Sequence, residues 1–195
     1  MSKPLIKASH ITLLDEQGLL FKPVSFVLEA GAMLYLTGEN GIGKSSLLKA
    51  IHQDLVDFGE VQYGVELKEI GWMPHHLPLY PSLNLKTHLD YFEKMVSCVP
   101  GYFAEAKANL SCDHLLRTPF GRLSQGQKQR ASLLALLHFP VKILLLDEPM
   151  SHQDKHHQIA MQAIIDLIID SGVAVLQTTH QPIYGKSIQL TKVVR

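Results

Sequence analysis

The sequence predicts an α/β fold in which helices flank a mainly parallel sheet. In the last third of the chain, an apolar strand-length run at 142–146 precedes a helical pattern at 155–170 and a second run at 173–178. Near the start, a glycine-rich turn at 38–46 joins another apolar run to a helical pattern. Alternation of strand and helix along a chain is typical of a sheet layered with helices, so these observations define the fold class.

The composition favours one ordinary globular domain. The 195 residues are 46% hydrophobic, and eighteen Lys and Arg balance eighteen Asp and Glu, for a formal net charge of zero. This length supports a stable core without disulfides, and the zero charge argues against nucleic acid or an anionic membrane surface as partner. Cys98 and Cys112 are expected to be ordinary thiols. No run approaches ~18 consecutive apolar residues, so no membrane-spanning helix is expected.

The predicted elements follow from local patterns. Apolar, branched or aromatic runs between turns predict strands in the first third, at 5–14, 24–28, 33–37, 59–64 and 69–73. Apolar residues at helical spacing predict a helix over 43–55. From about residue 76 to 140 the patterns are helical and no strand is expected, which indicates a helical insert between the two halves.

A glycine-rich segment fits the pattern of a phosphate-binding loop. Gly38, Gly43, Lys44 and Ser45 stand at its fixed positions, after a predicted strand and before a predicted helix. Glycines let successive backbone N–H groups turn onto phosphate oxygens, and the helix N-terminus adds partial positive charge. Lys44 would neutralise the phosphates and the Ser45 hydroxyl would ligate Mg²⁺. The predicted nucleotide-binding residues are Gly38, Glu39, Asn40, Gly41, Ile42, Gly43, Lys44, Ser45 and Ser46.

Two acidic residues follow the apolar run at 143–146, which is typical of a buried parallel strand. Open α/β sheets place ligands at the carboxyl ends of such strands. We therefore expect Asp147 to hold the Mg²⁺ shell through water, and Glu148 to polarise the attacking water. His180 follows the strand predicted at 173–178, and it reaches the same sheet edge if that strand lies beside the Asp147 strand.

The segment 123–130 begins another predicted helix, with Ser124 as its N-cap and Gln127 at the capping-box position. Its Leu-Ser-Gln-Gly-Gln start resembles the Leu-Ser-Gly-Gly-Gln signature motif of ATP-binding-cassette ATPases. The order of motifs is also similar to that family: phosphate loop, a Pro-His turn at 74–75, signature, acidic strand and a final histidine. The resemblance covers nearly the whole chain, from about residue 5 to residue 190.

The resemblance implies a P-loop NTPase core with an antiparallel β-subdomain and a helical signature subdomain. It implies one nucleotide-binding domain, 1–195, whose helical insert spans about 76–140. It also implies ATP and Mg²⁺ as ligands and ATP hydrolysis as the activity. Glu148 and His180 are then the expected catalytic residues.

The family's mechanism further implies a homodimer that encloses two ATPs. In it, the phosphate loop of one protomer would face the signature residues of the other, which are Ser124, Gln125, Gly126 and Gln127. A helix N-terminus aimed at a γ-phosphate binds ATP better than ADP, so closure would follow the nucleotide state. Integral membrane transporter subunits are the expected partners, and the cytoplasmic side of the inner membrane, as a peripheral protein, is the expected location. No nucleic-acid partner is expected.

The sequence departs from the family pattern at several positions. Gln125 stands where the family usually has Gly, and His75 stands where it has a Mg²⁺-contacting Gln. His75 can reach a phosphate or a water but is a poorer Mg²⁺ ligand. Asp154 matches the aspartate that the family has in the loop after the strand predicted at 143–146. The aromatic residue that stacks on adenine is missing from the aligned segment 13–15, so either base selectivity is relaxed or adenine packs on aliphatic groups.

The compact insert and His75 make the chain most similar, within the family, to the cytochrome c maturation ATPases, which work with haem-handling membrane subunits. His152, His156 and His157 suggest a haem or metal site through an i, i+4 pair. A solvated loop and helix start is favoured instead, because no third ligand is evident in the sequence.

Three alternatives stay open. One is an exporter ATPase of the same family for another substrate. A soluble cassette ATPase of DNA repair or translation would need a second cassette, a long coiled coil or a basic surface, and the sequence has none of these. A small-molecule P-loop kinase would explain Lys44 but neither the signature nor Glu148.

Overall fold

The computed structural model describes residues 3–74, 79–110, 115–151, 153–179 and 185–193. Its main sheet has five parallel strands in the order β10-β5-β9-β8-β7. These strands are β5 (Met33–Thr37), β7 (Ile70–Met73), β8 (Ile143–Leu146), β9 (Ala174–Thr178) and β10 (Ser187–Gln189). The parallel order confirms the main layer of the predicted fold.

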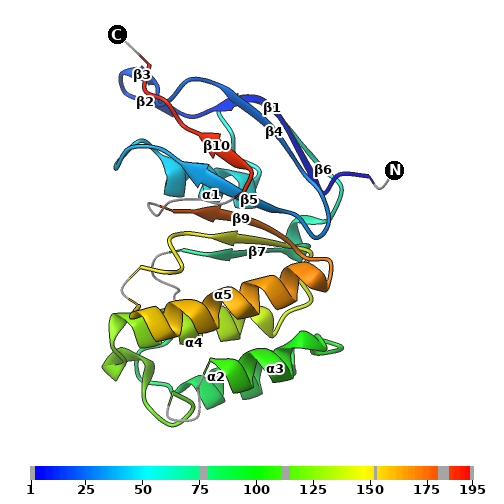
Figure 1. Ribbon diagram of the computed structural model, residues 1–195, viewed down its shortest axis with the longest axis vertical. Helices are drawn as coiled ribbons and strands as arrows, with labels where there is room; N and C mark the ends of the chain where they lie inside the picture. The colour runs from blue at the N-terminus through cyan, green and yellow to red at the C-terminus, as the bar shows by residue number, and fades with distance from the viewer. Residues whose placement is uncertain (1–2, 75–78, 111–114, 152, 180–184, 194–195) are drawn as a thin grey trace.

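An antiparallel sheet forms a second β layer, in the order β4-β1-β6. Its strands are β1 (Ile6–Thr12), β4 (Val24–Leu28) and β6 (Phe58–Tyr63), and a short hairpin joins β2 (Leu14–Asp15) to β3 (Gly18–Leu19). Figure 1 shows this sheet above the main sheet, with α1 (Lys44–Gln53) between the two. The antiparallel β-subdomain that the resemblance implied is therefore present.

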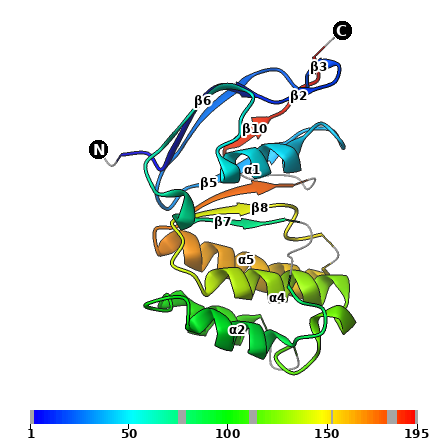
Figure 2. The ribbon, with the colours of Figure 1, turned by 180° about the vertical axis from the view of Figure 1, so that it is seen from behind.

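The other α-helices in the described part of the chain lie on the opposite side of the main sheet from α1. They are α2 (Leu85–Glu93), α3 (Tyr102–Asn109), α4 (Gln125–Leu137) and α5 (Lys155–Asp170). Figures 1 and 2 place α4 and α5 next to the sheet and α2 and α3 outside them. Within 79–110 and 115–139 the structure has no strand, only an isolated bridge between Asn84 and Pro119. The limits of the helical insert stay a prediction.

The strand β8 explains why both faces of the sheet need a cover. All four of its side chains are fully buried. Ile143 and Leu145 pack into the cluster around α1, whereas Leu144 and Leu146 pack into the cluster around α4 and α5. Successive strand residues point to opposite faces, so an unbroken aliphatic run requires apolar layers on both sides. Each such side chain contributes roughly 1.5–3 kcal/mol when fully buried.

The predicted strands and helices correspond to observed ones, with ends that differ by a few residues, and α5 has the predicted limits. Three short strands were not predicted: β2, β3 and β10. No helix in the described part of the chain is long and apolar enough to cross a membrane.

Candidate active site

The phosphate-loop segment lies where the sequence predicted it, between the end of β5 at Thr37 and the start of α1 at Lys44. The backbone of Gly43 has φ 104°, in the left-handed region that favours glycine. A Cβ at Gly43 would lie 2.4 Å from Cδ2 of Leu20. The backbone angle favours glycine here, and the close approach shows that the loop packs against Leu20, directly after the β2–β3 hairpin.

Lys44 directs its ammonium group into the loop. Its side chain is buried, and Nζ donates hydrogen bonds to the carbonyl oxygens of Gly38 at 2.9 Å and Glu39 at 3.0 Å. Gly43, the N-cap of α1, has no side chain with which to cap the first helical turn. First-turn N–H groups have no partner within a helix, so this end of α1 offers donors and partial positive charge to an anion.

A cleft of about 390 Å³ joins the two halves of the predicted site. The residues that line it are Asn40, Gly41, Gly43, Lys44, Ser45, Ser46 and Glu148. Ser45 and Ser46 are exposed to the cleft side of α1. Residues more than a hundred positions apart in the sequence are thus brought to one cavity, as the parallel arrangement of β5 and β8 requires.

The acidic pair at the end of β8 is held by the neighbouring strand. The strands β8 and β9 are paired, as expected, and Thr178 ends β9. The Thr178 hydroxyl donates to Oδ1 of Asp147 at 2.8 Å and accepts from the backbone N–H of Glu148 at 2.8 Å. Asp147 and Thr178 are buried, and Glu148 has a left-handed φ of 50°. One hydroxyl therefore fixes both acidic residues.

The backbone beyond Glu148 is tied to the start of α4. The carbonyl oxygen of Glu148 accepts from the Ser151 hydroxyl at 2.8 Å, and that hydroxyl oxygen accepts from Nε2 of Gln129 at 2.7 Å. The side chain of Gln153 donates from Nε2 to the carbonyl oxygen of Gly126 at 2.8 Å. A polar network within one chain therefore links the acidic strand end to the signature segment.

The signature segment has the predicted capping box. The Ser124 side chain accepts from the N–H of Gln127 at 3.3 Å, and Oε1 of Gln127 accepts from the N–H of Ser124 at 2.9 Å. Ser124 is exposed, and none of residues 124–127 lines the cleft. The helix α4 packs on the opposite side of the main sheet from α1 (Figures 1 and 2). In a single chain, the signature and the phosphate loop therefore face different surroundings.

Asp154, the last acidic residue of the predicted set, caps α5. Its carboxylate accepts from the N–H of His157 at 2.9 Å, and its second oxygen lies 2.8 Å from Nδ1 of His157. The hydrogen bond from the His157 backbone holds the pKa of the Asp154 carboxyl below its usual value, and the bond from the His157 side chain acts in the same direction. His75, His152 and His180 lie outside the described residues, as does Cys112, whereas Cys98 is an exposed free thiol.

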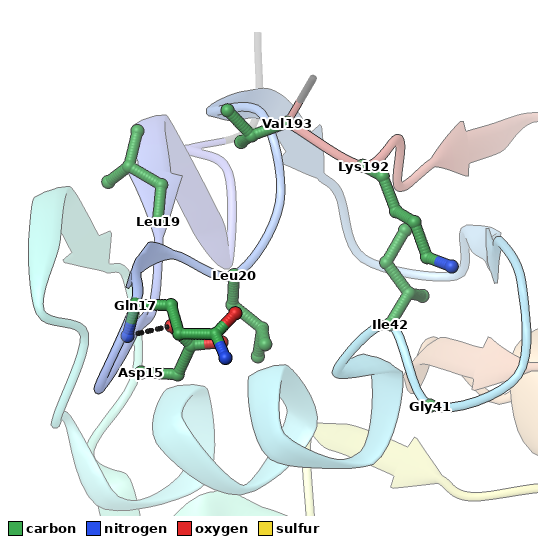
Figure 3. Close-up of a pocket in the computed structure, with 8 residues that line it drawn as sticks. All are labelled: Asp15, Gln17, Leu19, Leu20, Gly41, Ile42, Lys192 and Val193. Atoms are coloured by element: carbon green, nitrogen blue, oxygen red, sulfur yellow. Dashed lines mark hydrogen bonds between the residues drawn. The ribbon is translucent and has the colours of Figure 1, made fainter. Parts of the chain in front are cut away.

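A second pocket, of about 310 Å³, adjoins the phosphate loop and is shown in Figure 3. Its lining comes from the β2–β3 hairpin, the phosphate loop and the segment after β10, namely Asp15, Gln17, Leu19, Leu20, Gly41, Ile42, Lys192 and Val193. Gly41 lines both cavities. None of the eight residues is aromatic, in agreement with the missing aromatic at 13–15. Lys192 pairs with Glu39 at 2.7 Å and lowers the pKa of the Glu39 carboxyl.

Among the residues of this region that sequence reasoning missed are Thr178, Gln129 and Lys192. Thr178 carried a usable signal, because it ends a strand next to the acidic one and polar side chains at that edge face the ligand. Gln129 and Lys192 carried none, since their partners Ser151 and Glu39 are distant in sequence and meet them only in the folded chain.

Comparison with known proteins connects this geometry to a family. Residues 21–151 match the ABC transporter family. The chain is 33% identical over 181 residues to the cytochrome c biogenesis ATP-binding export protein CcmA of Gluconobacter oxydans. This aligned region covers 92% of this chain and 82% of that protein. It is 32% identical over 193 residues to the molybdate import ATP-binding protein MolC of Haemophilus influenzae, covering 90% of this chain and 74% of that protein.

Solved structures share the fold. The structure of cbiO1 from Clostridium perfringens, part of the ABC transporter complex cbiONQ, superposes with a TM-score of 0.78 at 20% identity. The superposition covers 97% of this chain and 86% of the other. The arrangement of the two sheets and the helical segment is therefore that of an ABC ATPase.

Proposed function

This chain belongs to the ABC transporter family, and from that premise we propose how its cleft binds and hydrolyses ATP. As a member of that family it is an ATP-hydrolysing subunit that works with membrane transporter components. The observation that carries the assignment of the site is the single cleft lined by Lys44, Ser45 and Glu148.

The triphosphate occupies this cleft, with its β- and γ-phosphates at the loop from Gly38 to Ser46. The Lys44 ammonium, already held by two loop carbonyl oxygens, supplies positive charge to the phosphate oxygens. The backbone N–H groups at the start of α1 supply further donors. Together they place the γ-phosphate on the side of the cleft that Glu148 lines.

The residues at this edge fit a hydrated Mg²⁺ ion. Hydroxyl and carboxylate oxygens are its preferred protein ligands, and Ser45 and Asp147 offer one of each. Because the Thr178 hydroxyl occupies one oxygen of Asp147, the carboxylate is oriented and keeps capacity to accept from a metal-bound water. When bound, Mg²⁺ neutralises negative charge on the phosphates.

Glu148 acts as the general base. It accepts a proton from the water whose oxygen attacks the γ-phosphorus, while the bond to the β-phosphate oxygen breaks and ADP leaves. The backbone N–H of Glu148 donates to the Thr178 hydroxyl and its carbonyl oxygen accepts from the Ser151 hydroxyl, and these two bonds fix the residue in its left-handed conformation. His180, which lies outside the described residues, completes the proposal by contacting the γ-phosphate, and His75 takes the position of the family's glutamine.

Two substitutions test these roles. Glu148→Gln keeps the size of the side chain but cannot accept a proton, so it should bind ATP with near wild-type affinity and lose turnover. Lys44→Ala should lose ATP affinity instead. Fluorescent ATP titration and phosphate release measure the two effects separately. Wild-type turnover in Glu148→Gln would remove Glu148 from the role of base.

The nucleoside end of ATP occupies the second pocket. That pocket shares Gly41 with the phosphate cleft, and its apolar lining comes from Leu19, Leu20, Ile42 and Val193. Adenine then packs on aliphatic side chains in place of an aromatic ring. Leu20→Ala should weaken ATP binding more than it weakens the binding of inorganic pyrophosphate, which competition titration measures.

Two copies of the chain form the working ATPase. The exposure of Ser124 and the position of α4 across the sheet from α1 support a site completed by the signature of a partner protomer. Ser124, Gln125, Gly126 and Gln127 would face the partner's γ-phosphate, and Asp154 would face the partner's loop. The Glu148→Gln variant should accumulate as a dimer in the presence of ATP, and sedimentation velocity measures the dimer fraction.

The transported substrate is proposed from the relatives. The chain is about equally similar to cytochrome c biogenesis export proteins and to a molybdate importer. The larger number of the former among the relatives, and the histidine at position 75, favour haem handling for c-type cytochrome maturation. Disrupting the gene should then abolish haem-stained c-type cytochromes. Normal cytochromes with lost molybdoenzyme activity would favour the molybdate alternative.

The protein is proposed to sit peripherally on the cytoplasmic face of the inner membrane, attached to integral membrane subunits. Attachment through these subunits is part of the proposal, because ABC ATPase subunits work with membrane transporter components. Membrane fractions from cells that lack those subunits should lose the protein. Copurification of the intact complex in detergent identifies them.

A further inference from the structure

Three side chains with metal-binding atoms meet at the start of α5. Asp154 accepts from the N–H of His157 with one carboxylate oxygen, and its other oxygen lies 2.8 Å from Nδ1 of His157. The ring of His156 packs edge-on against that of His157, with centroids 5.4 Å apart. One ligand atom from each of the three residues lies within 4.8 Å of the others. The helix-capping carboxylate is therefore a candidate for the third ligand that the sequence did not reveal.

The separations suit a small divalent ion. Zinc lies about 2.0–2.2 Å from nitrogen and oxygen ligands, so two ligands at a tetrahedral angle are about 3.3 Å apart. The pair formed by Asp154 and His157 is slightly closer than this, at 2.8 Å, and all three candidate ligand atoms lie within 4.8 Å of one another. Because the His156 side chain is exposed, rotation away from its edge-on contact with His157 can bring a ring nitrogen closer to the other two ligand atoms.

The donor set selects the class of metal. Two imidazoles and one carboxylate suit Zn²⁺ and neighbouring transition metals, whereas Mg²⁺ and Ca²⁺ prefer oxygen ligands. We propose that Asp154, His156 and His157 bind one divalent transition-metal ion, with Zn²⁺ as the representative, outside the Mg²⁺–ATP cleft. The cleft does not include any of these three residues, so the two ions occupy different sites.

The surroundings set the strength of binding. In the cluster, the Asp154 side chain is 65% exposed and the His157 side chain 28% exposed, so water can complete the coordination. Lys155 and the positive end of the α5 dipole repel a cation, whereas the negative charge of the Asp154 carboxylate attracts it. Three surface ligands with these opposing charges predict affinity in the micromolar range, below that of closed four-ligand zinc sites.

Zinc titration of the full chain without nucleotide tests the site. Calorimetry should show one Zn²⁺ per chain, and Co²⁺ as a probe should give the d–d absorption of a bound ion. His156→Gln and His157→Gln should each weaken Zn²⁺ binding at least tenfold, because each removes one of three ligands. His10→Asn is the matched control: His10 is exposed on β1 with φ 50°, a conformation that Asn tolerates, and this variant should bind Zn²⁺ as the wild type does.

The same titrations can overturn the proposal. Absence of saturable Zn²⁺ binding, or unchanged affinity in both His156→Gln and His157→Gln, would exclude this site. Should His157→Gln fail to fold, Asp154→Asn gives a second measurement, since its amide oxygen still caps α5 while the charged ligand is lost. Affinity in Asp154→Asn equal to that of the wild type would also contradict the proposal. Because no nucleotide is present, the result is independent of the roles proposed for Lys44 and Glu148.

Discussion

Replacing Thr178 by valine removes the one hydroxyl that holds both acidic residues of the site. Valine has nearly the same shape, so the packing of this fully buried position is kept. What is lost is the hydrogen bond to Oδ1 of Asp147 and the acceptor for the N–H of Glu148. The substitution therefore isolates the polar contribution of Thr178 to folding and to catalysis.

The structure gives the size of the effect. A hydrogen bond to a charged group contributes about 1.5–3 kcal/mol, and a neutral hydrogen bond such as that of the partly buried Glu148 N–H about 0.5–1.5 kcal/mol. Since the two losses share one side chain, we expect Thr178→Val to lower the free energy of unfolding by about 2–4 kcal/mol. Thr178→Ser keeps the hydroxyl and loses one methyl group, worth about 0.8 kcal/mol.

Urea unfolding of the two variants measures this difference, and phosphate release measures turnover. Thr178→Val should also lose at least about tenfold in turnover, which corresponds to about 1.4 kcal/mol of transition-state stabilisation, because Asp147 and Glu148 are no longer fixed. Thr178→Ser should retain most activity. If Thr178→Val were as stable and as active as Thr178→Ser, the hydroxyl would have no role in holding the acidic pair.

Three further substitutions test other parts of the account. Ser124→Ala should lower unfolding free energy by about 1 kcal/mol, since it removes the N-cap of α4, and Ser124→Asp should restore it in the same urea titration. Gly43→Ala should cost more stability than Gly41→Ala, because only the former places a Cβ against Leu20; equal thermal midpoints would contradict that contact. Burial among phenylalanine rings lowers the pKa of His138 in the folded chain, although Glu93 acts in the opposite direction. The unfolded chain therefore takes up the proton first, and stability falls as pH drops through the ordinary histidine pKa of about 6.5. Between neutral pH and about pH 5, the free energy of unfolding of His138→Leu should fall by less than that of the wild type, as urea unfolding measures. An equal fall in both proteins would show that His138 does not contribute to this pH dependence.

Elements with strong local signals were predictable from the sequence. The run 143–146 had to be a strand buried on both faces, and the structure packs its alternate residues into two different clusters. The capping box of Ser124 and Gln127 was also predictable, because its partners are three residues apart and the geometry of a helix start brings them together.

Features that depend on distant partners were not predictable. The strand β10 has three residues, only one of them buried, and it exists through pairing with β5. The proposed ligand role of Asp154 was missed for another reason: its partners are near in sequence, but only the N-cap conformation turns its carboxylate toward the first turn of α5. The bond between Thr178 and Asp147 joins residues 31 positions apart, through a pairing of strands that a local pattern does not contain.

The central claim is that each hydrolytic site is built from two copies of the chain. Mixing two inactive variants tests this claim most directly. Lys44→Ala lacks the phosphate lysine but keeps Ser124, and Ser124→Arg blocks the signature but keeps Lys44 and Glu148. A mixed dimer contains one intact site, so an equimolar mixture should recover up to about a quarter of the wild-type rate of ATP hydrolysis, while each variant alone is inactive. No recovery in a mixture that forms mixed dimers, or full activity of Ser124→Arg alone, would contradict a site built from two protomers.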